Sequence, residues 1–156
     1  MREYADEASD VGIAPSRSLW PDPIGLTPLA CPGTTTIRTA ELAAMLPESS
    51  PVLIDVALGS WGKSLPGAIG LQGTGYGSEF SQGVQDRFKR KIVELMNSNF
   101  TVPIVAFCAN SERLTACNLA LRLVSLGCTT VYWYRGGVEA WRANHLPVHD
   151  LTLQEW

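Results

Sequence analysis

Segments of strand length alternate with segments of helix length over most of this chain. Five short strands are expected, at the threonine-rich segment 34–37 and at four mostly apolar runs, 52–58, 68–71, 103–106 and 131–134. Apolar residues at helical spacing mark four expected helices, at 39–46, 78–97, 114–126 and 138–144. The nearly continuous apolar run at 52–58 is typical of a strand that is covered on both faces. Because helical connections of this length join parallel strands, the pattern predicts an α/β fold with a central, mostly parallel five-stranded sheet and helices on both faces.

The chain has 156 residues, a length that predicts one domain with a substantial core. Residues 1–33 form a proline-rich arm, and such a composition excludes regular helix and central strand. Five of the ten prolines lie there, at Pro15, Pro21, Pro23, Pro28 and Pro32. Two descriptions of this arm stay open: an extended, partly disordered leader, or a segment docked on the domain through Trp20, Ile24, Leu26 and Leu29. The domain itself is expected over residues 34–150, and a C-terminal tail over 151–156.

The charge and hydropathy of the chain exclude some classes of partner. The net charge is −3, and residues 1–10 account for it, since they hold one arginine against four acidic residues. The remainder is formally neutral and lacks the basic field of a nucleic-acid-binding protein. No run approaches the roughly 18 apolar residues of a membrane span, and the acidic N-terminus does not resemble a signal peptide. We expect a cytoplasmic protein without a membrane span, or a periplasmic one if an export signal has been removed.

The four cysteines, Cys31, Cys108, Cys117 and Cys128, are irregularly spaced. They match neither a disulfide framework nor a zinc-binding pattern, so we predict free thiols and no metal site. Cys31, beside a proline, is expected to be an incidental thiol. Cys117 is expected on the apolar face of a helix, where core packing is favoured over a role in resolving an oxidised Cys108.

Cys108 stands where the strand at 103–106 ends and the helix at 114–126 is about to begin. The first N–H groups of a helix lack backbone partners and the helix dipole adds positive charge, so such a turn can hold an anion or a thiolate. This environment lowers the pKa of a cysteine and makes it a nucleophile. The competing interpretation is an inert, buried cysteine. Because ligands bind at the carboxyl ends of parallel strands, Asp55 and the turn at 135–137 are expected within range of Cys108.

Four landmarks carry a family resemblance. They are Leu53-Ile54-Asp55-Val56, Leu65-Pro66-Gly67-Ala68-Ile69, the loop from Cys108 to Arg113 with four residues between them, and Tyr134-Arg135-Gly136-Gly137-Val138-Glu139-Ala140-Trp141. With these landmarks the sequence resembles a single-domain rhodanese over roughly residues 35–148. The segments 66–77 and 132–137 are also similar to a rhodanese subgroup, the PQQ-dependent catabolism-associated CXXCW-motif proteins, whose second cysteine and tryptophan are absent here.

The resemblance implies a rhodanese-like fold and sulfurtransferase activity. A sulfane sulfur would pass from a thiosulfate- or persulfide-type donor to a thiophilic acceptor through a persulfide on Cys108, the catalytic nucleophile. The substrate-binding residues would be Ala109, Asn110, Ser111, Glu112, Arg113 and Arg135. Asp55 would provide structural support. The resemblance implies no cofactor besides the covalent persulfide, and its partners would be a small sulfur-containing anion or persulfide donor and an acceptor that is a small thiol or a protein.

Several positions depart from the rhodanese pattern. Ser111 stands where glycine is common, Leu114 where a small hydroxyl residue often follows the arginine, Ala57 where an arginine is expected, and Ser64 where a histidine is frequent. Glu112 would raise the pKa of the thiol and disfavour a dianion if it pointed inward. These departures leave a second function open, a rhodanese module that binds a sulfur compound or a partner protein without turnover. Phosphatase or arsenate-reductase chemistry normally needs one more loop residue, so the spacing argues against it.

Overall fold

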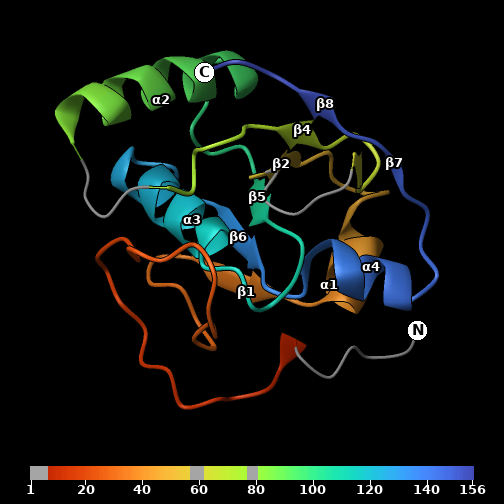
Figure 1. The fold of residues 1–156 in the computed structure, drawn as a ribbon. Coiled ribbons are helices and arrows are strands. Elements are labelled where there is room, and N and C mark those ends of the chain that lie inside the picture. The colour runs from red at the N-terminus through yellow and green to blue at the C-terminus, as the bar shows by residue number, and fades with distance from the viewer. Residues whose placement is uncertain (1–6, 57–61, 77–80) are drawn as a thin grey trace.

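The computed structural model describes residues 7–56, 62–76 and 81–156. Its central sheet has six strands in the spatial order β1-β6-β5-β2-β4-β8, and every neighbouring pair is parallel (Figure 1). The strands are β1 Thr35–Ile37, β2 Val52–Asp55, β4 Ile69–Gly70, β5 Ile104–Phe107, β6 Val131–Tyr134 and β8 Thr152–Leu153. The predicted α/β fold with a mostly parallel sheet is confirmed.

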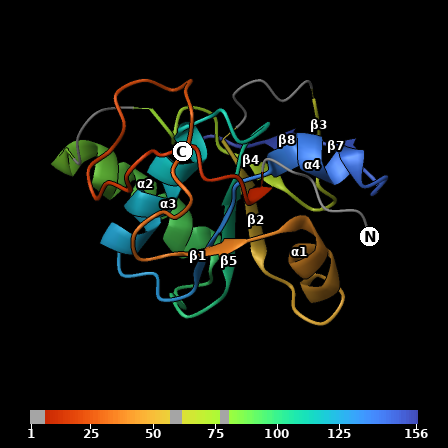
Figure 2. The ribbon, with the colours of Figure 1, turned by 90° about the horizontal axis from the view of Figure 1, so that it is seen from below.

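Two pairs of helices cover the two faces of the sheet, as Figure 2 shows. The helices are α1 Thr39–Met45, α2 Gln82–Leu95, α3 Thr115–Ser125 and α4 Gly137–Ala143. On the α2/α3 face, Phe88 and Ile92 of α2 belong to the same core cluster as Trp133 of β6. On the α1/α4 face, Leu42 of α1 packs in a second cluster with Trp141 of α4. Strands covered on both faces need apolar residues at successive positions, which explains the unbroken apolar runs of the sequence.

Strand β5 lies at the centre of the sheet, and all four of its residues are buried. Its last residue, Phe107, is in register with Asp55 of β2 on one side and with Tyr134 of β6 on the other. The residues that follow these three strands therefore meet at one edge of the sheet. Cys108 and Arg135 are the first residues beyond β5 and β6, so the register brings the two predicted site segments together.

The sheet has one strand more than the five predicted, because residues of the expected C-terminal tail add β8 beside β4. Gly70 of β4 makes room for this strand, since a Cβ there would lie 2.5 Å from Leu153 Cδ2. Beyond β8, the Trp156 indole donates to the Gln72 carbonyl at 2.7 Å. Two further strands, β3 Lys63–Ser64 and β7 His149–Asp150, form a separate antiparallel pair. Strands β3, β7 and β8 have two residues each, too few for a periodic sequence pattern, which is why these three strands were not predicted.

The described part of the arm, residues 7–33, lies against the domain. Leu19 and Cys31 are buried in the core cluster on the α2/α3 face, and Trp20 packs partly buried against it. The other three apolar residues considered for docking, Ile24, Leu26 and Leu29, are exposed. Leu19 and Cys31, together with the polar contacts described below, therefore hold the arm.

Some sequence predictions extend outside the described residues. They concern the last two positions of the strand predicted at 52–58, which include Ala57, and the first three of the helix predicted at 78–97. Within the three described ranges, no helix combines the length and the apolar character needed to cross a membrane.

Candidate functional site

The backbone of the Cys108 loop is held by the first turn of α4. Val138 N–H donates to the Cys108 carbonyl at 3.0 Å, and Glu139 N–H donates to the Ala109 carbonyl at 2.9 Å. Gly137, directly before Val138, has a φ of +66°, and a Cβ on it would stand 2.3 Å from the Cys108 carbonyl oxygen. Only glycine fits such a close approach in this conformation. The glycine pair singled out in the sequence thus lets the turn support the loop.

The next loop residues form a compact turn. Asn110 Oδ1 accepts the Glu112 N–H at 2.9 Å, an arrangement typical of an Asx-turn. Ser111 is buried and does not belong to the residues with positive φ, so serine needs no left-handed conformation there. Glu112 is exposed, so its carboxylate lies on the outside of the loop.

The Cys108 thiol is enclosed, with only 1% of the residue's surface exposed. Burial raises the pKa of Cys108 from 9.0 to about 11, and the negative charge of Asp55 adds to this increase. The Thr115 hydroxyl, which donates to the sulfur at 3.4 Å, the Ala109 backbone N–H and the Arg113 charge act in the opposite direction. The turn was expected to lower the pKa, and that expectation is wrong for this conformation because burial outweighs the stabilising groups. The thiol is therefore protonated near neutral pH.

Thr115 is a site residue that the sequence analysis missed. The expected position of a hydroxyl residue, directly after Arg113, is occupied by Leu114, and Thr115 supplies a hydroxyl one residue later. A shifted hydroxyl at the start of the helix is the signal that would have identified it.

Asp55 lies at the position predicted for structural support. It is fully buried, and the Ser64 hydroxyl donates to its Oδ2 at 2.9 Å. Its backbone carbonyl accepts the Leu71 N–H at 3.0 Å. Ser64, which replaces the histidine frequent in rhodaneses, thus has a defined partner, and the Asp55 carboxylate connects β3 to the sheet edge.

Arg113 closes the loop and combines two roles. Its backbone forms an isolated antiparallel bridge with Ile24 of the arm. In its half-buried side chain, the Nε atom is buried and makes no hydrogen bond within the described part of the chain. A buried guanidinium N–H without a partner is costly, so this atom is available to an anion. The positive charge of Arg113 lowers the pKa of Cys108, although burial and the other groups around the thiol have larger effects.

The arm runs across the outside of the loop. Gly25 N–H donates to the Glu112 carbonyl at 2.9 Å, and Leu114 N–H donates to the Pro23 carbonyl at 3.0 Å. The Thr27 hydroxyl donates to the Ser111 carbonyl at 2.6 Å. These contacts make the arm an added strand-like cover over residues 111–114.

Arg135, predicted to bind substrate, binds the arm in this structure. The guanidinium is buried, and it donates from Nε to Thr27 Oγ1 at 2.8 Å, from Nη2 to the Thr27 carbonyl at 3.0 Å, and from Nη1 to the Ser9 carbonyl at 2.7 Å. Farther along the arm, Glu7 Oε1 accepts the Thr39 N–H at 2.7 Å. Sequence reasoning missed Thr27 and Glu7, since no local pattern indicates which distant residue an arm will contact.

Comparison with known proteins agrees with this geometry. Residues 38–144, more than half of the chain, match the rhodanese-like domain. The chain belongs to the rhodanese-like family. No functionally curated protein matches it.

Solved structures share the rhodanese-like fold at low sequence identity. A thiosulfate sulfurtransferase from Pseudomonas aeruginosa is 19% identical with a TM-score of 0.55, over 78% of this chain and 21% of that protein. This chain therefore spans about a fifth of the Pseudomonas protein. The rhodanese-like domain of an Anabaena protein is 18% identical with a TM-score of 0.52, over 76% of this chain and 80% of the other. A Rhodopseudomonas palustris protein of unknown function, described as a possible tyrosine phosphatase, is 19% identical with a TM-score of 0.51, over 74% and 83% of the two chains.

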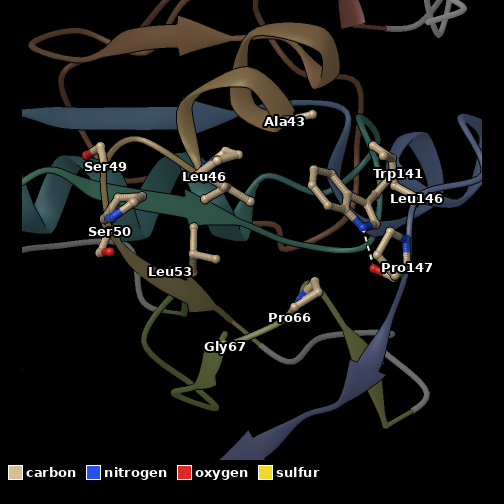
Figure 3. A pocket seen from close by; sticks show the side chains of 12 residues that line it. Ala43, Leu46, Ser49, Ser50, Leu53, Pro66, Gly67, Trp141, Leu146 and Pro147 are labelled. Atoms are coloured by element: carbon tan, nitrogen blue, oxygen red, sulfur yellow. Dashed lines mark hydrogen bonds between the residues drawn. The ribbon is translucent and has the colours of Figure 1, made fainter.

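An apolar groove of about 540 Å³ lies elsewhere on this rhodanese-like domain (Figure 3). Its lining includes Leu46 after α1, Leu53 of β2, Pro66, and Trp141 of α4, and it contains no residue of the loop from Cys108 to Arg113. The Trp141 indole donates to the Pro147 carbonyl at 2.7 Å at one side of the groove. The groove also includes Ser50 and Pro51, which precede β2, whereas Cys108 follows the carboxyl end of β5. The groove and the cysteine loop are therefore separate features.

Proposed function

We propose that this rhodanese-like protein is a sulfurtransferase that carries a sulfane sulfur on Cys108. The observation that carries the proposal is the loop itself, which begins at the buried Cys108 and ends at Arg113, whose buried Nε has no hydrogen-bond partner among the described residues. Membership of the rhodanese-like family and the fold shared with a thiosulfate sulfurtransferase support it.

The chemistry uses the thiolate of Cys108 as a nucleophile. After the thiol loses its proton to solvent, the thiolate attacks the outer sulfur of a thiosulfate-type donor, and the donor's S–S bond breaks with its electron pair on the departing sulfite. A thiolate or cyanide acceptor then attacks the outer sulfur of the persulfide, and the Cys108 thiolate leaves. Arg113 and the backbone N–H groups of the loop would stabilise the anionic donor and the charged persulfide.

Turnover requires access to the thiol, which is buried in this structure, and the arm lies across the neighbouring loop residues 111–114. The raised pKa and the enclosure describe a resting conformation in which Cys108 is protected. In the active conformation, solvation of the thiol and approach of an anion next to Arg113 would follow displacement of the arm at residues 23–27.

The test is sulfur transfer to cyanide from thiosulfate and from an organic thiosulfonate. We expect turnover with at least one donor, loss of that turnover in Cys108→Ser, and a one-sulfur mass increase on Cys108 after incubation with donor alone. Cys128→Ser is the matched control, because Cys128 is also a buried thiol whose pKa burial raises to about 11, yet it precedes β6 and lies outside the loop. A sulfur adduct on another cysteine would contradict the proposal.

The second candidate function is a non-catalytic rhodanese module that binds a sulfur compound or a partner protein. The enclosed, protonated state of Cys108 favours it. It predicts donor binding without a persulfide and an unchanged affinity in Cys108→Ser. Absence of turnover and of any sulfur adduct, in a protein that is folded by circular dichroism, would select this function over transfer.

A further inference from the structure

Cys31 of the arm and Cys117 of α3 lie against each other inside the protein. Their Sγ atoms are 2.6 Å apart, and the Cys31 thiol is also 3.4 Å from the Cys117 carbonyl oxygen. Both residues are buried, with exposed fractions of 1% and 0%. A disulfide bond is about 2.0 Å long, so the two sulfurs need to approach only slightly further to reach bonding distance. Cys31 was predicted to be an incidental thiol, and this contact gives it a specific partner.

We propose that Cys31 and Cys117 form a reversible disulfide that fastens the arm over the Cys108 loop. The disulfide itself does not depend on the proposed function, whereas its effect on Cys108 concerns that same site. Both cysteines lie close in sequence to residues that join the arm to the loop. Cys31 comes four positions after Thr27, which donates to the Ser111 carbonyl. Cys117 comes four positions after Arg113, whose backbone forms a bridge with Ile24.

A covalent bond at this position would limit movement of the arm. In the reduced protein, hydrogen bonds and apolar contacts hold residues 23–27 on the loop, and segments held in this way open and close without global unfolding. In the oxidised protein, Cys31 is fixed to the first turn of α3, so the three residues between it and Thr27 set how far the cover can lift. The disulfide therefore restricts access to Cys108.

The oxidation is a thiol–disulfide exchange with a small disulfide. When the arm lifts, the thiolate of one cysteine attacks the small disulfide and releases one small thiolate, leaving a mixed disulfide. When the arm returns, the thiolate of the other cysteine attacks the protein sulfur of that mixed disulfide and releases the second small thiolate. The two cysteines lose two electrons to the small disulfide, and their two protons pass to the released thiolates.

The closed arrangement protects the pair from reaction. The hydrogen bond with Cys117 and burial both raise the pKa of Cys31, which keeps it protonated while the arm is docked. Exchange therefore starts from the open conformation, and closure completes it. The remaining buried cysteine, Cys128, contacts the Met96 sulfur at 3.8 Å and so lies in a different part of the core.

The experiment incubates the full chain with glutathione disulfide and maps its cysteines by mass spectrometry without reduction. We expect one linked peptide pair joining Cys31 to Cys117, absent in Cys31→Ser and Cys117→Ser and present in the control Cys128→Ser. Because the bond closes a loop of about 85 residues, we expect a melting temperature roughly 10 °C higher than that of the reduced protein, reversed by dithiothreitol. Recovery of both thiols free, or a bond joining either one to Cys108, would overturn the pairing.

A second readout tests the effect on the site without using turnover. The rate at which iodoacetamide alkylates Cys108 is measured on reduced and oxidised wild type, so no variant needs to fold. We expect oxidation to slow this reaction about tenfold and dithiothreitol to restore it. If the Cys31–Cys117 disulfide forms but the alkylation rate of Cys108 stays unchanged, the proposal that the disulfide fastens the arm over the loop is wrong. Failure of sulfur transfer would leave both readouts unaffected, so the two proposals fail separately.

Discussion

The carbonyl oxygen of Cys108 packs directly against the Cα of Gly137, so closely that a Cβ at this glycine would lie 2.3 Å from it. This contact joins two residues almost thirty positions apart, and it leaves the least room for a side chain of any contact in the site. The glycine turn supports the loop because it adds no side chain between them, and the following N–H groups reach the loop carbonyls.

Gly137→Ala should destabilise the protein by about 2–4 kcal/mol, because it combines a clash with the Cys108 carbonyl and a positive φ. Urea unfolding measures this change. Gly83→Ala in α2 is the matched control: a Cβ there meets nothing within 4 Å, so we expect a neutral effect or a gain of about 0.5–1 kcal/mol. Equal stabilities of the two variants would contradict the described packing.

Thr27→Val should uncover Cys108. The substitution removes a buried hydroxyl that donates to the Ser111 carbonyl and accepts from Arg135 Nε, leaving both groups without this partner. We expect a loss of about 1–3 kcal/mol in unfolding free energy and faster alkylation of Cys108 by iodoacetamide. Thr129→Val, which removes an exposed hydroxyl that donates to the Phe100 carbonyl at 3.4 Å, should change stability by less than about 0.5 kcal/mol and leave the alkylation rate as it is.

The charge of Asp55 should be visible in the titration of Cys108. Since Asp55 raises the pKa of Cys108, Asp55→Asn should lower it from about 11 and increase the alkylation rate at a given pH below that value. Asp150→Asn is the control, because Asp150 is exposed and paired with Lys63 on the antiparallel ribbon. A pH profile of alkylation, with the modified peptide identified by mass spectrometry, checks both variants; identical profiles would contradict the role given to Asp55.

The raised pKa also predicts how stability depends on pH. The folded chain holds the Cys108 proton up to about pH 11, whereas the ordinary pKa is 9.0, so between these values the unfolded chain binds fewer protons. The contribution is complete below the ordinary pKa and is lost as pH rises through the folded pKa. Wild type should therefore lose more unfolding free energy than Cys108→Ala between pH of about 8 and about 11, measured by urea unfolding. An equal loss would indicate that Cys108 is not buried as described.

Arg113 should favour anionic donors. If its buried Nε binds the donor, Arg113→Ala should lower kcat/KM for thiosulfate by about tenfold or more, and lower it less for an uncharged organic trisulfide. Arg90→Ala, an exposed arginine of α2, is the control and should leave both donors unchanged. The same loss with charged and uncharged donors would assign Arg113 to the closure of the loop alone.

The sequence predicted the elements whose patterns are local. The apolar run through Val105 and the turn around Gly137 identified the central strand, the cysteine loop and its support, because strand burial and glycine conformation act within a few residues. The strand at Thr152–Leu153 escaped detection since two residues have no period. The contacts of Thr27 and the pairing of Cys31 were also missed, because their partners lie far away in the sequence and are brought near the arm only by folding.

The position of Arg135 has a consequence for how the protein forms during synthesis. This residue lies 108 positions after Thr27, so the arm cannot contact its anchor until residue 135 has been synthesised. Strand β1, at the edge of the sheet, likewise cannot pair until its neighbour β6 has been synthesised. Such long-range contacts form slowly. A nascent chain therefore has residues 111–114 uncovered for a time, and docking of the arm on them is a late event in folding.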